Sequence, residues 1–126
     1  MTQVLLVDDN PLQLSVREAV LRTAGFEVSV ATTAESALAT LRVFRDRIGV
    51  VVTDHLMPGC SGSELVRRIR ELNLWLPVIV LSGLPEAEPE YAGLDVIFRP
   101  KPIPPPELID LLRSSLAQPR RQQGAA

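Results

Sequence analysis

Residues 50–59 read VVVTDHLMPG, and this stretch decides the fold. The unbroken run of valines predicts a strand that is buried on both faces, as in the centre of a parallel sheet. The strand ends near Asp54, whose carboxylate is costly to bury unless it has partners. The following Met57-Pro58-Gly59 segment predicts a loop. The stretch therefore predicts a central strand that brings an acidic side chain to one edge of a sheet.

Strand and helix patterns alternate along the rest of the chain. Apolar runs predict strands over residues 3–7, 26–30, 50–53, 77–81 and 95–98, with helices after the first, second, third and fifth. The residues expected to form the buried stripes of these four helices are Leu12, Val16, Ala19, Val20 and Thr23; Ala34, Ala37, Leu38 and Leu41; Leu65, Ile69 and Leu72; and Leu108, Leu111, Leu112, Ser115 and Leu116. This alternation is typical of an α/β protein.

The crossover between the fourth and fifth strands departs from this pattern. Residues 81–95 contain Gly83, Pro85, Pro89 and Gly93, which disfavour a regular helix. At best, a short helix fits there.

Right-handed crossovers leave few topologies for such a chain. We expect a flavodoxin-like, doubly wound, five-stranded parallel sheet of order 2-1-3-4-5 with helices on both faces and a short or degenerate fourth crossover helix. A chain of 126 residues has the size of one domain. We assign residues 1–117 to this domain and residues 118–126 to a flexible polar tail.

Composition narrows the functional classes. The formal net charge of −2 provides no field that would attract nucleic acid. The apolar runs are too short to cross a bilayer, and the N-terminus lacks a basic, apolar signal segment, so we expect no membrane contact and a cytoplasmic location. A single cysteine, Cys60, excludes an internal disulfide and a cysteine-based metal cluster.

Polar residues follow four of the predicted strands. Asp8 and Asp9 follow the first, Asp54 the third, Ser82 the fourth and Lys101 the fifth. Taken singly, helix capping explains the first two, a turn explains Ser82, and solvent exposure explains Lys101. In a doubly wound sheet, however, the carboxyl ends of the strands meet at the ligand site. The joint arrangement therefore favours a functional site over four separate structural roles.

Three carboxylates at one edge repel each other unless their pKa values rise or a cation neutralises them. Magnesium prefers oxygen ligands and retains waters, which suits one or two of the carboxylates of Asp8, Asp9 and Asp54, a backbone carbonyl and an incoming phosphate. Asp54 can then act as a nucleophile toward phosphorus, while Lys101 and the ion offset the charge on the phosphoryl oxygens and Ser82 hydrogen-bonds the group.

At this point the sequence resembles the receiver domains of bacterial two-component response regulators from Val4 to about Leu116. The motifs that carry the resemblance are Val4-Leu5-Leu6-Val7-Asp8-Asp9, Asp54-His55-Leu56-Met57-Pro58-Gly59 with Gly62, Leu81-Ser82-Gly83, and Lys101-Pro102.

The resemblance implies a phosphoacceptor, Asp54, that is served by a histidine kinase or a histidine phosphotransfer protein and controls contacts with a downstream protein. It implies direct magnesium ligation by Asp9 and Asp54, ligation by Asp8 mainly through water, and a backbone carbonyl ligand from Leu56. It further implies that Ser82 and Lys101 hold the phosphoryl oxygens, that the Lys101–Pro102 bond is cis, and that Phe98 occupies an aromatic switch position.

Several features depart from the family pattern. Phe98 lacks the hydroxyl of the more usual tyrosine, and the reduced fourth crossover makes dimerisation through that face doubtful, so we expect a monomer or a weak dimer. We also expect His55 and Cys60, although near Asp54, to be exposed and inert.

Three functions stay open. The first is a signalling switch that catalyses only its own phosphorylation and dephosphorylation, either alone or within a longer protein. The second is a receiver-like binding module that works without phosphorylation. The third, an aspartate-nucleophile phosphatase, needs an acid/base carboxylate two residues after the nucleophile, where this chain has Leu56.

Overall fold

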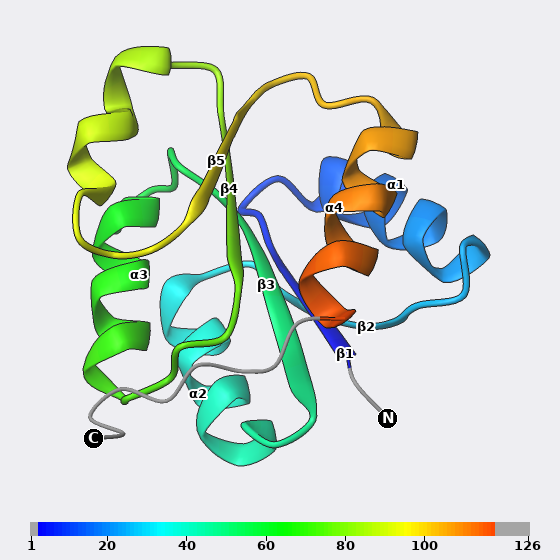
Figure 1. Cartoon of the computed structure of the whole chain (residues 1–126), viewed down its shortest axis with the longest axis horizontal. Coiled ribbons are helices and arrows are strands. Elements are labelled where there is room, and N and C mark those ends of the chain that lie inside the picture. The colour runs from blue at the N-terminus through cyan, green and yellow to red at the C-terminus, as the bar shows by residue number, and fades with distance from the viewer. Residues whose placement is uncertain (1–2, 118–126) are drawn as a thin grey trace.

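The chain folds into three layers, with a parallel sheet between two pairs of helices (Figure 1). The structure is a computed structural model that describes residues 3–117, so the predicted tail at 118–126 lies outside the described residues. The sheet has the order β2-β1-β3-β4-β5, as predicted. In chain order the elements are β1 Gln3–Val7, α1 Pro11–Thr23, β2 Glu27–Ala31, α2 Ala34–Phe44, β3 Ile48–Asp54, α3 Gly62–Glu71, β4 Val78–Ser82, the 3₁₀ helix η1 Pro85–Tyr91, β5 Ile97–Pro100 and α4 Pro105–Ala117.

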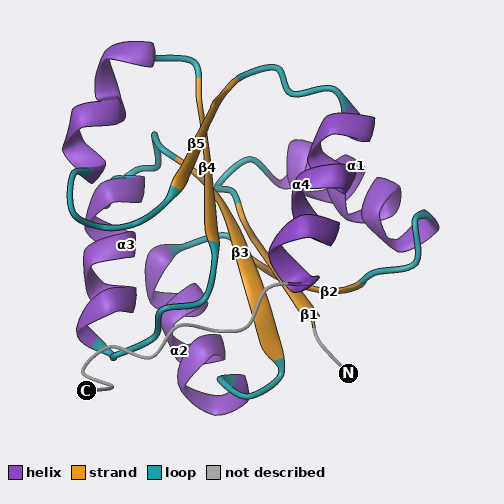
Figure 2. Ribbon diagram, in the orientation of Figure 1, coloured by secondary structure: helices purple, strands orange, loops and turns teal. Residues whose placement is uncertain are grey.

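The sheet is covered on both faces, with α1 and α4 on one side and α2 and α3 on the other (Figure 2). Because successive side chains of a strand point to opposite faces, β3 supplies both apolar cores. Val50 and Val52 pack toward α1 and α4, and Val51 packs toward α2 and α3. Ile48 also packs toward α2 and α3, because the pairing of β3 with β1 shifts by one residue between Ile48 and Val50. All four are at most 1% exposed, which confirms the prediction of a central strand buried on both faces.

Side-chain caps start the first three helices at one edge of the sheet. Asn10 accepts hydrogen bonds from the N–H groups of Leu12 at 3.0 Å and Gln13 at 3.1 Å. The predicted cap Thr33 begins α2, and Ser61 begins α3. These caps satisfy backbone donors that a helix leaves without partners. The chain therefore reverses direction close to each strand end, and the residues in the turns stay near the edge.

The buried faces of α2, α3 and α4 are as predicted, but that of α1 is not. Leu14 and Leu21, two turns apart, pack against the sheet, whereas Leu12 is 74% and Val16 59% exposed. Val20 is half-buried. The apolar residues of α1 exceed one stripe, and those nearest α4 line a groove of about 400 Å³ between the two helices instead of the core. None of the helices within residues 3–117 has the length and apolar character to span a membrane.

The fifth strand begins two residues later than predicted, at Ile97 rather than Asp95. Asp95 has a φ of 57°, a left-handed conformation that a strand does not allow. The fourth crossover contains only the 3₁₀ helix η1, which confirms the expected short helix.

A buried arginine fixes the C-terminal end of this irregular segment. Arg70, at the end of α3, is 6% exposed, and its guanidinium lies 4.8 Å from the centre of the Trp75 ring. It donates hydrogen bonds to the carbonyl oxygens of Leu74 at 2.9 Å, Leu76 at 2.8 Å, Leu94 at 2.8 Å and Asp95 at 2.9 Å. One side chain thus ties α3 to the loops before β4 and before β5.

We predict that Arg70→Lys lowers the free energy of unfolding by about 2–4 kcal/mol, because an ammonium does not match four carbonyls placed around a planar guanidinium. Urea unfolding measures the change. The matched control is Arg68→Ala, which removes an exposed arginine of the same helix and is expected to change stability by less than about 0.5 kcal/mol. Equal effects of the two variants would contradict the role of Arg70.

Candidate functional site

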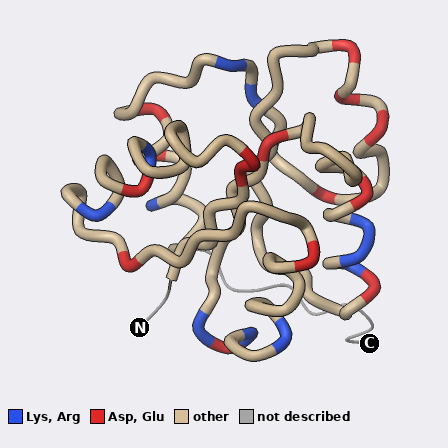
Figure 3. The backbone as a smooth tube through the Cα atoms, turned by 180° about the vertical axis from the view of Figure 1, so that it is seen from behind, with Lys and Arg blue, Asp and Glu red and all other residues tan. Residues whose placement is uncertain are grey.

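Acidic side chains converge beyond the carboxyl ends of the central strands. Asp8 follows β1, and Asp54 is the last residue of β3. Asp8, Asp9 and Asp54 each offer a carboxylate oxygen, and these atoms lie within 4.8 Å of one another. In Figure 3, acidic segments meet near the centre of the view from behind. The structure therefore brings together the three carboxylates that the sequence placed at this edge.

Asp54 is buried, and one cation contacts it. Its side chain is 3% exposed, and Lys101 Nζ lies 2.8 Å from Asp54 Oδ1. Burial, with a contribution from the neighbouring Asp8, raises the pKa of Asp54 from 3.8 to about 6, and Lys101 opposes this shift. Lys101 is the only lysine in the sequence. Its backbone N–H donates to the carbonyl of Ser82 at 2.9 Å, which holds the start of the Lys101 loop against the end of β4.

Asp8 has two partners of its own. Its Oδ1 accepts a hydrogen bond from the N–H of Asn10 at 2.9 Å, and its Oδ2 lies 3.4 Å from a guanidinium nitrogen of Arg17. Sequence reasoning missed Arg17. The available signal was its spacing, since it lies between Leu14 and Leu21 on the face of α1 that packs on the sheet. Arg17 is thus a second cation at the acidic edge.

The donor set fits a hard divalent cation. All three side chains offer carboxylate oxygens, which are the ligands that Mg²⁺ prefers. Within residues 3–117, buried Asp54 Oδ1 has no polar partner other than the Lys101 ammonium. A bound divalent cation would reduce the repulsion among three carboxylates that Lys101 and Arg17 only partly offset.

Ser82 lies at the same edge, but its hydroxyl is engaged in its own loop. Ser82 is 2% exposed. Its Oγ accepts a hydrogen bond from the N–H of Leu84 at 2.9 Å and lies 3.2 Å from the carbonyl oxygen of Leu84. A rotation of the serine side chain toward Asp54 therefore breaks both contacts with Leu84.

Comparison with known proteins agrees with this geometry. The family model of the response regulator receiver domain matches residues 4–113. The chain belongs to this family. One relative is the C4-dicarboxylate transport transcriptional regulatory protein DctD of Pseudomonas aeruginosa, which is 37% identical to this chain over 118 residues. The aligned region covers 91% of this chain and 25% of DctD.

A second relative is the transcriptional regulatory protein TrcR of Mycobacterium tuberculosis, which is 31% identical over 119 residues, covering 90% of this chain and 45% of TrcR. The chain thus spans less than half the length of these two relatives. The crystal structure of FixJ-N superimposes with a TM-score of 0.86 at 27% identity, covering 96% of this chain and 98% of that chain. The flavodoxin-like fold of the receiver domain is therefore shown by both the strand order and the superposition.

The roles predicted for two further residues, Leu56 as a metal ligand and Phe98 as a switch residue, stay predictions. Leu56 is 64% exposed beside the acidic edge, and nothing in the structure tests its carbonyl as a ligand. Phe98 is half-buried in β5, with its ring centre 5.7 Å from that of Tyr91. The Lys101–Pro102 bond is cis, as the resemblance implied.

The prediction that His55 is exposed is wrong. His55 is 4% exposed, and its Nδ1 lies 2.7 Å from the hydroxyl oxygen of Tyr91. No local signal marks this contact, because its partner lies 36 residues away along the chain. Cys60 is half-buried, and burial raises the pKa of its thiol, which disfavours the reactive thiolate.

We predict that Asp54→Asn stabilises the receiver domain at pH 8 in the absence of divalent ions. Because the pKa of Asp54 is about 6 when folded and 3.8 ordinarily, the folded chain binds this proton more tightly than the unfolded chain. The contribution of this group to stability is greatest below pH 3.8 and is lost as the pH rises through about 6. In urea unfolding with EDTA, the free energy of unfolding of the variant should exceed that of the native chain by roughly 1–3 kcal/mol at pH 8 and by little at pH 4.

The control for this prediction is Asp46→Asn, which removes an exposed aspartate outside the site. A gain for Asp54→Asn that is equal at pH 4 and pH 8 would show that ionisation of Asp54 is not its cause. Adding Mg²⁺ should stabilise the native receiver domain more than Asp54→Asn, since we expect this carboxylate to be a ligand of the ion in the folded state.

Proposed function

We propose that Asp54 of this receiver domain accepts a phosphoryl group from a histidine kinase or a histidine phosphotransfer protein, and that the modified domain changes its contacts with a downstream protein. Mg²⁺ would bind at Asp8, Asp9, Asp54 and the backbone carbonyl of Leu56. The observation that carries the proposal is the 2.8 Å contact between Lys101 Nζ and the buried Asp54 Oδ1, beside two more carboxylates.

The proposed reaction is a transfer from the imidazole nitrogen of the donor to a carboxylate oxygen. An oxygen of Asp54 forms the new bond to phosphorus, while the phosphorus–nitrogen bond breaks and its electron pair returns to the donor imidazole. Bound Mg²⁺ supplies positive charge to the phosphoryl oxygens. The Lys101 ammonium already lies at the reacting carboxylate, so it needs little reorganisation to offset the transferred charge.

Ser82 and Phe98 are proposed to report the modification. The Ser82 hydroxyl would turn from Leu84 to a phosphoryl oxygen, which changes the loop that begins η1. The Phe98 ring, although it lacks a hydroxyl, can change its burial as this loop moves. The charge placed on Asp54 would in this way alter a surface away from the site.

The proposed chemistry is confined to the receiver domain itself. Asp54 gains the group and later loses it by hydrolysis, without turnover of a separate small substrate. A family member that acts as a signalling switch needs only this cycle, because its output is a change of protein contacts.

The decisive measurement is the intact mass after incubation with acetyl phosphate. We expect one added phosphoryl group on the native chain with Mg²⁺, and none with EDTA or in Asp54→Ala, because both the nucleophile and the ion are required. Asp46→Asn is the matched control for loss of a carboxylate and should be modified like the native chain.

An adduct that persists in Asp54→Ala would contradict the assignment of the acceptor. The absence of any adduct on the folded native chain would instead favour a receiver domain that binds its partner without phosphorylation.

We also predict that Lys101→Met slows adduct formation by about 100-fold, the effect typical of losing one preorganised charge at a reacting oxygen. Methionine keeps much of the apolar stem while removing the ammonium. Lys101→Arg should restore only part of the rate, because a guanidinium does not replace a compact ammonium at this distance. The control is Arg42→Met, which removes an exposed cation from α2. An unchanged rate for Lys101→Met would exclude Lys101 from the reaction.

A further inference from the structure

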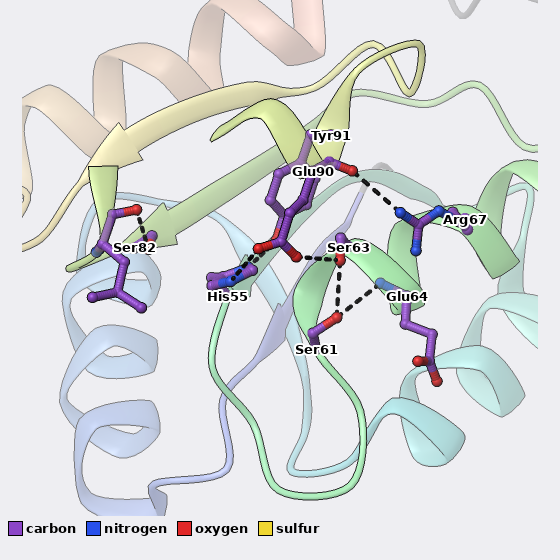
Figure 4. Close-up of polar contacts among 9 residues, drawn as sticks. His55, Ser61, Ser63, Glu64, Arg67, Ser82, Glu90 and Tyr91 are labelled. Carbon is purple, nitrogen blue, oxygen red and sulfur yellow. Dashed lines mark hydrogen bonds and ion pairs between the residues drawn. The ribbon is translucent and has the colours of Figure 1, made fainter. Parts of the chain in front are cut away.

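A second polar cluster lies next to the acceptor, beneath η1 (Figure 4). His55 Nδ1 is 2.7 Å from the Tyr91 hydroxyl oxygen, and His55 Nε2 is 3.7 Å from Glu90 Oε2. The other oxygen of Glu90 accepts a hydrogen bond from Ser63 at 3.2 Å, and Ser63 contacts Ser61 at 2.9 Å. The cluster thus connects the residue after the acceptor to η1 and to the start of α3.

The central contact of this cluster is buried. His55 and Tyr91 are each 4% exposed, and their rings meet edge to face with centres 5.6 Å apart. Burial raises the pKa of the Tyr91 hydroxyl well above its ordinary value, which keeps the hydroxyl protonated and able to hydrogen-bond His55. The Tyr91 ring also packs against Phe98 on β5, with ring centres 5.7 Å apart. Tyr91 therefore contacts both the residue after the acceptor and the proposed switch residue Phe98.

The backbone of α3 leaves room for the Tyr91 hydroxyl. A Cβ at Gly62 would lie 2.5 Å from the Tyr91 hydroxyl oxygen, 2.6 Å from the Asp54 carbonyl oxygen and 3.0 Å from the Cα of His55. Any larger residue would therefore push Tyr91 away from the loop after the acceptor. The N–H of Gly62 donates to the His55 carbonyl at 2.7 Å, which closes this loop.

The helix η1 is held at both ends by residues next to the acceptor site. Its preceding residue, Leu84, is bound by the Ser82 side chain, and its last residue, Tyr91, is bound by His55. Ser82 ends β4, and His55 directly follows Asp54. Both ends of η1 are thus held by residues beside Asp54.

We propose that the hydrogen bond between His55 and Tyr91 is a latch that holds η1 in its resting position and opposes phosphoryl binding at Asp54. The inference rests on the proposed function. When Ser82 turns to a phosphoryl oxygen, it gives up both contacts with Leu84, and the first end of η1 is released. The latch still holds the second end, so η1 and the acidic surface that it carries cannot move until the latch opens. That surface consists of the exposed residues Glu86, Glu88 and Glu90.

A latch that favours the resting arrangement has a reciprocal effect at the acceptor. If phosphoryl binding opens the latch, then removal of the latch must strengthen phosphoryl binding by the same factor. One buried hydrogen bond corresponds to a factor of about three to ten. His55 and Tyr91 therefore act as positioning residues, and their loss should increase affinity, whereas damage to the fold should decrease it.

The test uses Tyr91→Phe, which removes only the hydroxyl and retains the ring. The probe is fluoroberyllate with Mg²⁺, a mimic of the phosphoryl group, titrated into the untagged chain and followed by NMR. Because the sequence contains one histidine and one tyrosine, their ring signals are assigned without ambiguity. We expect the native ring signals to shift on titration, and the variant to bind the probe about three to ten times more tightly.

Two further variants sharpen this test. Ser29→Ala is the matched control, since it removes a side-chain hydrogen bond of 2.7 Å to Gln3 at the far edge of the sheet and should leave the affinity unchanged. His55→Leu should strengthen probe binding as Tyr91→Phe does. The double variant should bind the probe no more tightly than either single variant, because both changes remove the same hydrogen bond between His55 and Tyr91. His55→Leu also serves if Tyr91→Phe does not fold.

Unchanged or weaker binding of the probe to the folded Tyr91 and His55 variants would overturn the latch while leaving the proposed function intact. A native chain that binds no fluoroberyllate in the presence of Mg²⁺ would overturn the proposed function, and the latch with it.

Discussion

Negative charge buried at the carboxyl edge of the sheet is the constraint on which the rest of the structure depends. β1 and β3 are covered on both faces, so the residues at their ends, Asp8 and Asp54, cannot reach bulk water. Their charges must be balanced by side chains brought from elsewhere. Arg17 from α1 and Lys101 from the loop after β5 supply this balance, and the cis bond after Lys101 lies in that same loop. The charge balance accounts for the position of residues from widely separated parts of the chain.

Sequence reasoning predicted the features of the fold that depend on local periodicity. The alternation of strands and helices and the short fourth crossover follow from apolar runs, helical stripes and the positions of proline and glycine, whereas the strand order was chosen among the few topologies that right-handed crossovers allow. The predicted buried face of α1 was wrong because the spacing of apolar residues alone does not distinguish a face that packs on the core from an exposed apolar face. The predicted start of β5 was wrong because Asp95 has a left-handed backbone. The carbonyl oxygen of Asp95 accepts a hydrogen bond from Arg70, a contact between residues distant in sequence that the local pattern does not reveal.

The predictions for the site also divide into those that local sequence supports and those that it does not. Asp8, Asp9, Asp54, Ser82 and Lys101 were predictable because strand ends in a parallel sheet meet at one edge. Arg17 and His55 were missed because their roles depend on contacts across the fold. The contact between His55 and Tyr91 exists only because α3, η1 and the loop after β3 pack together, and no short stretch of sequence encodes that arrangement. Long-range polar contacts are where inference from a single sequence stops.

The way in which η1 is anchored also bears on how such a protein can evolve. The segment is fixed from outside: Ser82 and His55 hold its ends, and Arg70 holds the loop that follows. Among its exposed acidic positions, Glu90 contacts His55 and Ser63, whereas Glu86 and Glu88 take no part in these contacts. Glu86 and Glu88 can accept substitutions that alter partner choice while the fold and the acceptor chemistry are retained, so a rigid site and a variable contact surface can coexist within a few ångströms.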